Sequence, residues 1–177
     1  ISIPFFQGNT EQSMKMGQAM AEIITKDLET SGLFRPLDPR SFLKDGSIDD
    51  KPRFADWRLI KSQFLVKGRL FIDENKIRVE FRMYDVLSEQ QIEGQALEST
   101  LDQWRRISHK IADMIYERST GDKGYFDSQI TYVTKVGQKN AVRKLAIMDY
   151  DGANHRYLSD GAAIVLTPRF SPNSTLL

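Results

Sequence analysis

The sequence contains no cysteine, which excludes disulfide bonds and thiolate metal sites and fits a cytosolic or a periplasmic protein equally well. Neither sign of charge is in excess, because 25 Lys and Arg residues are matched by 24 Asp and Glu residues, a net charge of +1. A chain this close to neutral lacks the bulk attraction that holds nucleic acid or anionic lipid. No apolar run reaches the roughly 18 residues of a membrane-spanning helix, so we expect no direct membrane insertion.

The common catalytic motifs are missing as well. The chain has no Gly-x-Ser-x-Gly elbow, Walker A loop, His-Glu-x-x-His motif or Gly-x-Gly-x-x-Gly loop. Its two histidines are poor candidates for a catalytic base. His109 falls off the apolar stripe of a predicted helix and is interpreted as a solvated residue, and His155 follows a turn and is assigned to the surface. We therefore assign no catalytic, cofactor-binding or metal-binding residue and expect no cofactor.

Three short loops resemble ligand-binding motifs. Asp73-x-Asn75 and residues 45–50 share acidic spacing with calcium loops, but both lack the twelve-residue pattern with its central Gly and final Glu. Gly121-x-x-Gly124 has the spacing of a KH-type RNA-binding loop, which joins two helices. Here the loop joins a helix to a strand. We interpret the first two as turns and the third as a helix stop followed by an interdomain linker.

The last third of the chain has the pattern of β-strands. Alternating strands are predicted at 130–134 and 145–148, and the second leads into Asp-Tyr-Asp-Gly at 149–152, a strong signal for a tight turn. Residues 168–172, Pro-Arg-Phe-Ser-Pro, resemble the recurring corner of PD40-type propeller blades, with Asn-Ser at 173–174 in place of the usual Asp-Gly. Since one blade cannot bury its own faces, we expect residues 125–177 to be an incomplete first β-propeller blade of a longer protein.

Two long amphipathic helices are predicted before that region. The first covers residues 11–30, with a capping box formed by Asn9 and Gln12. The second begins at Thr100, where Gln103 completes another capping box, and it carries a continuous apolar stripe. Glycines end both helices, at positions 32 and 121. Met16 and Met20 lie on the apolar face of the first helix and are interpreted as core residues.

Strands and a short helix complete the first region. Strands are predicted at 1–6 and 33–37, parallel to each other, and at 64–72, 77–84 and 91–98, which form an antiparallel meander. A short helix capped by Asp50 should turn Phe54, Trp57 and Ile60 inward. Trp57 and Trp104 are predicted to be buried core residues without a ligand role. The predicted fold class is α/β, with an N-terminal domain at 1–124 in which a mixed β-sheet packs with two long helices.

The order of these pieces resembles the TolB family, periplasmic components of the Tol-Pal envelope system of Gram-negative bacteria. The resemblance covers nearly the whole chain, and the block at 27–38 and the helix-to-strand junction are its most specific parts. The matching segments are 3–6 (Ile-Pro-Phe-Phe), 27–38, 103–106 (Gln-Trp-Arg-Arg), 115–126 with 130–133, 149–152 and 168–172.

The resemblance implies a non-enzymatic periplasmic adaptor that links the peptidoglycan-associated lipoprotein Pal with TolA and supports outer-membrane integrity and cell division. In the family the TolA-contacting segment precedes the position of Ile1, and the Pal surface lies mostly on blades after Leu177. Partner-binding residues are therefore unknown, and the oligomeric state stays open. An alternative is the N-terminal accessory region of a propeller-containing serine peptidase. A nucleic-acid-binding module is a third possibility, and the near-neutral charge argues against it.

Overall fold

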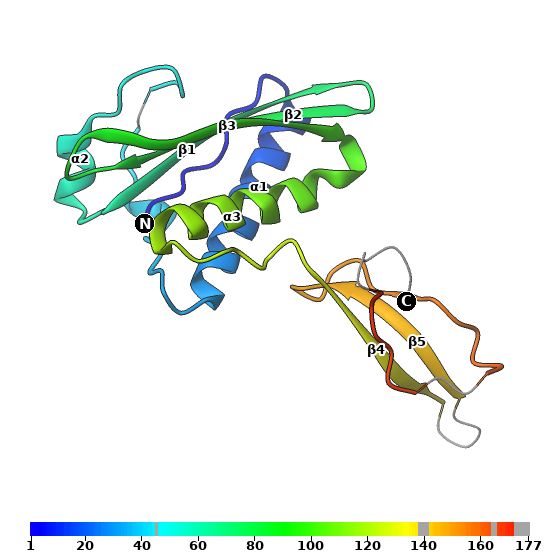
Figure 1. The fold of residues 1–177 in the computed structure, drawn as a ribbon. Coiled ribbons are helices and arrows are strands. Elements are labelled where there is room, and N and C mark those ends of the chain that lie inside the picture. The colour runs from blue at the N-terminus through cyan, green and yellow to red at the C-terminus, as the bar shows by residue number, and fades with distance from the viewer. Residues whose placement is uncertain (45, 138–141, 164–165, 172–177) are drawn as a thin grey trace. The chain divides into compact units, whose positions relative to one another are not determined.

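The computed structural model describes the chain except for residues 45, 138–141, 164–165 and 172–177. It divides into two compact units, Ile1–Gly124 and Tyr125–Leu177. Both contain antiparallel sheet, and the first adds two long helices (Figure 1). The predicted fold class is therefore confirmed. No helix among the described residues is long and apolar enough to cross a membrane.

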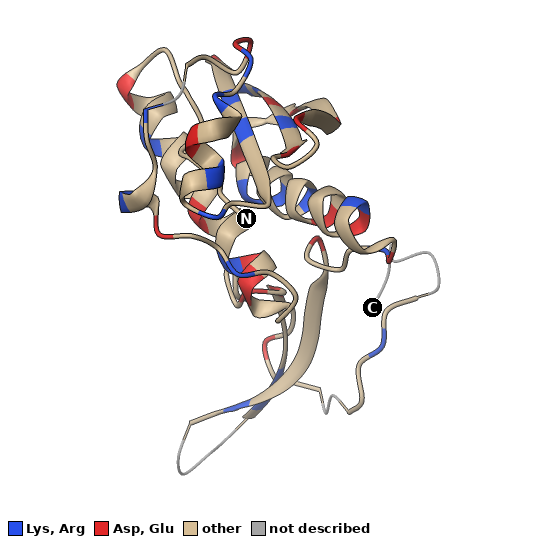
Figure 2. Ribbon diagram, turned by 90° about the vertical axis from the view of Figure 1, so that its left-hand side faces the viewer, with Lys and Arg blue, Asp and Glu red and all other residues tan. Residues whose placement is uncertain are grey.

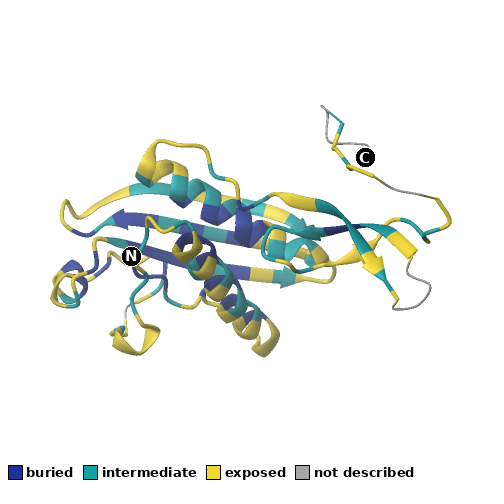
Figure 3. Cartoon of the chain, turned by 90° about the horizontal axis from the view of Figure 1, so that it is seen from below, coloured by how far each residue is buried: buried dark blue, intermediate teal, exposed yellow. Residues whose placement is uncertain are grey.

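The sheet of the first unit is the predicted meander. Strands β1 (Phe64–Asp73), β2 (Lys76–Asp85) and β3 (Gln90–Thr100) lie in that order, each antiparallel to the next. Alternation along β2 sends one set of side chains into the core, and Figure 3 shows buried residues gathered on the sheet. On the helix side of β2 the buried residues are Ile77, Val79, Phe81 and Met83, whereas Tyr84 is buried on the other face.

Two helices, α1 (Glu11–Thr30) and α3 (Trp104–Thr120), cover one face of this sheet (Figure 1). Their buried faces contribute Met20, Ile24, Leu28, Ile107, Ile111 and Ile115. A glycine in the left-handed region follows each helix, with φ of 74° at Gly32 and 82° at Gly121. Both predicted helix ends are confirmed, because only glycine adopts that backbone conformation without steric cost.

The first helix begins at the predicted residue, but both predicted capping boxes were wrong. The first helix is capped by Thr10, whose side chain accepts from the N–H of Ser13, while the Ser13 hydroxyl accepts from the backbone N–H of Thr10. Thr100 remains the last residue of β3 and makes no side-chain cap. Its hydroxyl hydrogen-bonds Asp102, which lowers the pKa of that carboxyl. The chain then passes through a 3₁₀ turn, η2 (Leu101–Gln103), before α3 begins.

The two predicted N-terminal strands were also wrong. Residues 1–7 make only two isolated parallel bridges to β1, Ser2 with Leu65 and Gln7 with Arg69, so the segment follows the edge of the sheet without becoming a regular strand. Between the bridges, the Phe6 N–H bonds the Gly17 carbonyl of α1 instead of the sheet. Residues 33–37 form no strand. Their hydrogen bonds go to Ile1, and the 3₁₀ turn η1 (Pro39–Ser41) follows.

A second, smaller core lies on the opposite face of the sheet. Helix α2 (Phe54–Leu59) buries Phe54 and Trp57 against residues of β1 and the end of β2, with Ile60 partly buried beside them. The predicted burial of Trp57 is confirmed, since its exposed fraction is 2%. The prediction for Trp104 was wrong. It is only half-buried at the first position of α3, with the Arg105 guanidinium 5.6 Å from its ring centroid.

The second unit contains β4 (Gln129–Val136), β5 (Val142–Asp149) and the two-residue β6 (Arg156–Tyr157), in that order. The predicted turn after β5 is confirmed: Gly152 has a φ of 86° and its N–H bonds the Asp149 carbonyl. Of the predicted blade corner, positions 172–174 lie outside the described residues.

Candidate binding surfaces

The loop between η1 and α2 is held on the polar face of the sheet by one buried lysine. Lys67 lies in the middle of β1, and its ammonium donates to the Ser47 carbonyl at 2.6 Å and to the Asp50 carbonyl at 3.4 Å. Ile48 is buried beside it. A buried ammonium needs such acceptors, so Lys67 fixes the loop at this place. This anchor was not predicted from the sequence. A lysine directly after the apolar residues 64–66 is the signal that could have indicated it.

A chain of ion pairs continues across the same face. Arg69 bonds the carboxylates of Asp49 and Glu80, and Arg82 also bonds Asp49, at 2.9 Å. Arg78 then joins Glu80 to Glu98 on β3, at 2.9 and 2.7 Å. Figure 2 shows the two signs of charge interspersed over the molecule.

These ion pairs favour the ionised form of the Asp49 and Glu80 carboxylates. The hydrogen bond from Arg69 is the main cause that lowers the pKa of both Asp49 and Glu80. The described part of the 45–50 segment forms a turn, with the Asp50 N–H bonding the Ser47 carbonyl, and Asp45 lies outside the described residues. Asp49 accepts hydrogen bonds from the guanidinium groups of Arg69 and Arg82. We therefore interpret Asp49 as a residue that holds the loop on the sheet.

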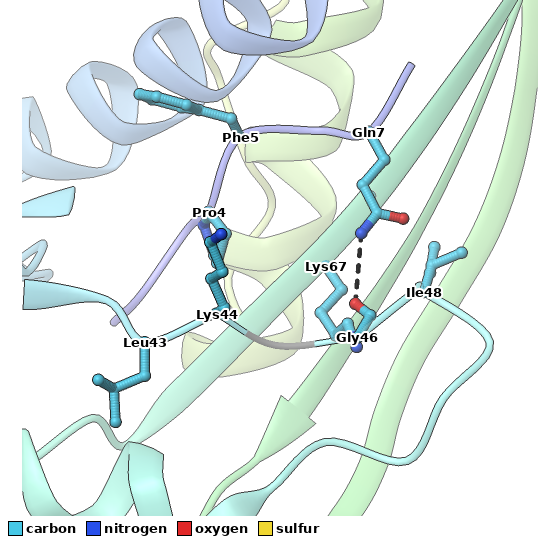
Figure 4. A pocket seen from close by; sticks show the side chains of 9 residues that line it. Pro4, Phe5, Gln7, Leu43, Lys44, Gly46, Ile48 and Lys67 are labelled. Atoms are coloured by element: carbon cyan, nitrogen blue, oxygen red, sulfur yellow. Dashed lines mark hydrogen bonds between the residues drawn. The ribbon is translucent and has the colours of Figure 1, made fainter. Parts of the chain in front are cut away.

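A pocket of about 190 Å³ lies between this loop and the N-terminal segment (Figure 4). The Gln7 side chain donates to the Gly46 carbonyl at 3.2 Å and bridges the two walls. Phe5 and Leu43 contribute apolar surface and are 47% and 51% exposed. Pro4, Lys44, Ile48, Lys67 and Gly68 complete the lining. The groups that this pocket offers for binding are the apolar side chains of Phe5 and Leu43 and the exposed Lys44, because the Lys67 ammonium is already engaged with the loop carbonyls.

A second hollow, of about 70 Å³, lies where β3 meets α3. Leu97, Glu98 and Ser99 line it from the strand, and Arg106 and Lys110 line it from the helix. The adjoining residues 94–96 of β3 are all exposed. Sequence reasoning identified β3 as a strand and did not identify it as a candidate surface.

The prediction that His109 is a solvated residue was wrong. Its exposed fraction is 2%, and its Nδ1 lies 2.6 Å from Oδ2 of Asp27, which is equally buried. The pair joins α3 to α1 across 82 positions of sequence. His109 lies beside Ile107 and Ile111, and a helix packed on two sides buries a wider arc than its apolar stripe alone. Only an acidic residue on the inner face of α1 could have signalled the pair.

The predicted local structure is confirmed at His155, at Gly121 and at the turn of residues 73–76. His155 is exposed in the second unit, in a row of rings with Tyr132 and Tyr157, whose centroids lie 6.0 and 5.0 Å from its own. Gly121 is the left-handed residue that ends α3, as expected of a helix stop. A side chain at Gly124 would collide with Asp113, so this glycine permits a close approach of the chain to α3. The turn at 73–76 joins β1 to β2.

The fold defines a two-unit protein: an α/β unit of two helices on a three-stranded sheet, and a unit of antiparallel strands like those of propeller blades. A family model described as the TolB amino-terminal domain matches residues 1–92, and one described as the TolB beta propeller domain matches residues 116–177. The first match alone covers more than half of the chain. The chain therefore belongs to the TolB family.

Individual relatives agree with this assignment. The Tol-Pal system protein TolB of Paramagnetospirillum magneticum is 48% identical over 177 residues, a match that covers 98% of this chain and 40% of the relative. The chain thus spans about two fifths of that protein's length. The crystal structure of TolB from Acinetobacter baumannii has the same fold, with a TM-score of 0.81 at 23% identity over 98% of this chain and 42% of that one. The structure of a PelC dodecamer from Paraburkholderia phytofirmans matches with a TM-score of only 0.44 at 11% identity, over 66% of this chain and 84% of that one.

Proposed function

We propose that this chain is the N-terminal part of a non-enzymatic periplasmic adaptor of the Tol-Pal system in a Gram-negative bacterium. The observation that carries the proposal is the 48% identity to a Tol-Pal system protein TolB, which extends over 98% of the chain. In this role the full protein links Pal to inner-membrane Tol components such as TolA. It thereby supports outer-membrane integrity and cell division.

The surfaces of the first unit suit an adaptor. Its two described hollows are small and open beside strands and loops, and they offer apolar and charged contacts. Buried polar groups such as Lys67 and the Asp27–His109 pair hydrogen-bond within the unit and connect its elements. In the proposed organisation, residues 1–124 are one domain, and 125–177 begin the propeller as its incomplete first blade. The split of the chain into compact units at Gly124 and Tyr125 supports this division. The first family model ends at residue 92, inside the proposed first domain, and the second begins at residue 116, shortly before the proposed boundary.

The test uses the full-length gene product. Purified protein should bind the soluble domains of Pal and TolA in calorimetric titrations. Expressed in a strain that lacks its own TolB, it should restore resistance to detergent and stop the leakage of periplasmic enzymes. Failure of both assays with a folded, exported protein would refute the adaptor role. A Gly-x-Ser-x-Gly elbow in the rest of the gene would favour the peptidase alternative instead.

A further inference from the structure

We propose that the open edge of β3, together with the hollow between β3 and α3, binds an extended segment of a protein partner that carries acidic side chains. The segment would add to the sheet as a fourth strand beside residues 94–98. Main-chain hydrogen bonds would supply affinity, and alternate side chains would supply specificity. This surface is independent of the Tol-Pal role proposed above, and its test does not require any Tol-Pal component.

The hydrogen bonds of β3 indicate which groups are available at this edge. β2 occupies one side of β3 along its length, and no other strand in the described part of the chain pairs with it. The Gly94 N–H bonds the carboxylate of Glu93 at 2.8 Å instead of a strand. Because N–H and C=O groups alternate in direction along an antiparallel strand, those of Ala96 and Glu98 point to the same open side.

The two edges of the sheet differ in their protection. Residues 1–7 follow the β1 edge and bridge to it at Ser2 and Gln7. β3, by contrast, is 11 residues long and contains neither Pro nor Lys, the residues that commonly protect an exposed edge from pairing. A β-bulge interrupts the pairing near the beginning of β3. Met83 and Tyr84 pair with Glu93 and Gln91, which leaves Ile92 as the extra residue, and the pairing of residues 94–100 is regular. This stretch is a suitable template for another strand.

Charge next to the edge selects the kind of segment. Side chains of an added strand would alternate between the helix side and the outer side of the sheet. On the helix side they would enter the hollow lined by Arg106 and Lys110, whose positive charges attract an acidic side chain. On the outer side the neighbour is Glu98, already paired with Arg78 at 2.7 Å, so neutral side chains fit there. The pattern predicted for the partner is acidic residues at every second position.

The probes are two labelled nine-residue peptides, one alternating Thr with Glu and one alternating Thr with Lys. Fluorescence anisotropy with the 177-residue chain should show binding of the Glu peptide at least about tenfold tighter than that of the Lys peptide, a difference of about 1.4 kcal/mol. The double variant Arg106→Glu and Lys110→Glu should reverse this preference. Lys26→Glu, an exposed charge change on α1, is the matched control and should leave the preference unchanged.

The edge itself is tested by Ala96→Pro, which removes one outward N–H while the bonds to β2 stay in place. Binding of the Glu peptide should fall at least about tenfold. Hydrogen exchange on the unmodified chain gives a second readout, because the peptide should slow exchange at Gly94, Ala96 and Glu98 and leave Gln95 and Leu97 unchanged. Equal binding of the two peptides, or no added protection at these three amides, would overturn the proposal. If the chain forms a dimer and Ala96→Pro abolishes that dimer, the edge binds a second copy of the chain, and the proposal of an acidic partner is overturned.

Discussion

Strand β2 of the first unit and strand β4 of the second have similar alternating sequences but very different surroundings. In β2, every second residue from Ile77 to Met83 is buried, because α1 and α3 cover that face. In β4 all residues are exposed or half-buried. Within the strands of the second unit, only Ala146 and Ile147 on β5 are buried. Alternation thus predicts a strand, and a second layer is needed to turn its apolar face into a core.

In the first unit the polar face of the sheet is also covered, by a small core and by a loop. Trp57 and Phe54 close one end of that face, and the loop anchored by Lys67 covers its middle. In the second unit, Tyr132 of β4 and Tyr157 of β6 instead form a row of rings with His155, in which His155 and Tyr157 are exposed. We therefore expect the free energy of unfolding to be concentrated in residues 1–124.

The largest expected effect is in the small core of the first unit. Trp57→Ala removes a large ring that is 2% exposed and should lower the free energy of unfolding by about 3–5 kcal/mol. Urea denaturation followed by circular dichroism measures this change. Leu59→Ala, on the same helix but 78% exposed, is the control and should change stability by no more than about 0.5 kcal/mol. Equal losses in the two variants would show that α2 contributes no core.

The second largest loss of stability is expected at the buried Asp27–His109 pair between the long helices. Asp27→Ala leaves Nδ1 of His109 without its carboxylate partner inside the unit and should cost about 1–3 kcal/mol. Glu29→Ala, at an exposed position two residues further along α1, is the matched control. Thermal melting of both variants measures the difference. A melting temperature of Asp27→Ala equal to that of the control would show that the pair does not stabilise the contact between α1 and α3.

Hydrogen exchange compares the two units without a mutation. The Ile147 amide of β5 should exchange at least about tenfold faster than the Val79 amide of β2, a difference of about 1.4 kcal/mol in opening free energy. The physical reason is that β5 lies in a sheet with few buried side chains, whereas β2 is the central strand under two helices. Slow, concentration-independent protection of Ile147 in a monomer would mean that the partial blade is stable by itself.

The smallest effect concerns the ion pairs on the polar face. Arg69 lowers the pKa of Glu80, so the stabilisation from this pair is present above the ordinary carboxyl pKa of about 4 and is lost as the pH falls further. Glu80→Gln should cost about 1 kcal/mol or less at pH 7, because both partners are partly exposed. It should also flatten the decline in stability below pH 4, whereas Glu117→Gln, an exposed change on α3, should leave that decline intact.

Candidate surfaces were harder to predict from the sequence than the elements that carry them. β3 is evident from its residues, but the sequence does not show that residues 1–7 protect β1 and leave β3 open. Arg106 and Lys110 are two polar residues on a predicted helix. They become a charged hollow only because α3 packs beside the exposed end of β3. Such a site depends on which neighbours the fold supplies, and periodicity carries no information about them.

By itself the sequence determined the local structure: the helix ends at Gly32 and Gly121, the β-meander, and the turn at Gly152. Each depends on backbone conformation or on the alternation of neighbouring residues, which short-range physics controls. Tertiary structure alone decided that His109 pairs with Asp27, that Trp104 is only half-buried and that residues 33–37 bond Ile1 instead of the sheet. The first and the last of these outcomes join residues far apart in the chain. They follow from which polar groups must find partners once the helices and the sheet have packed together.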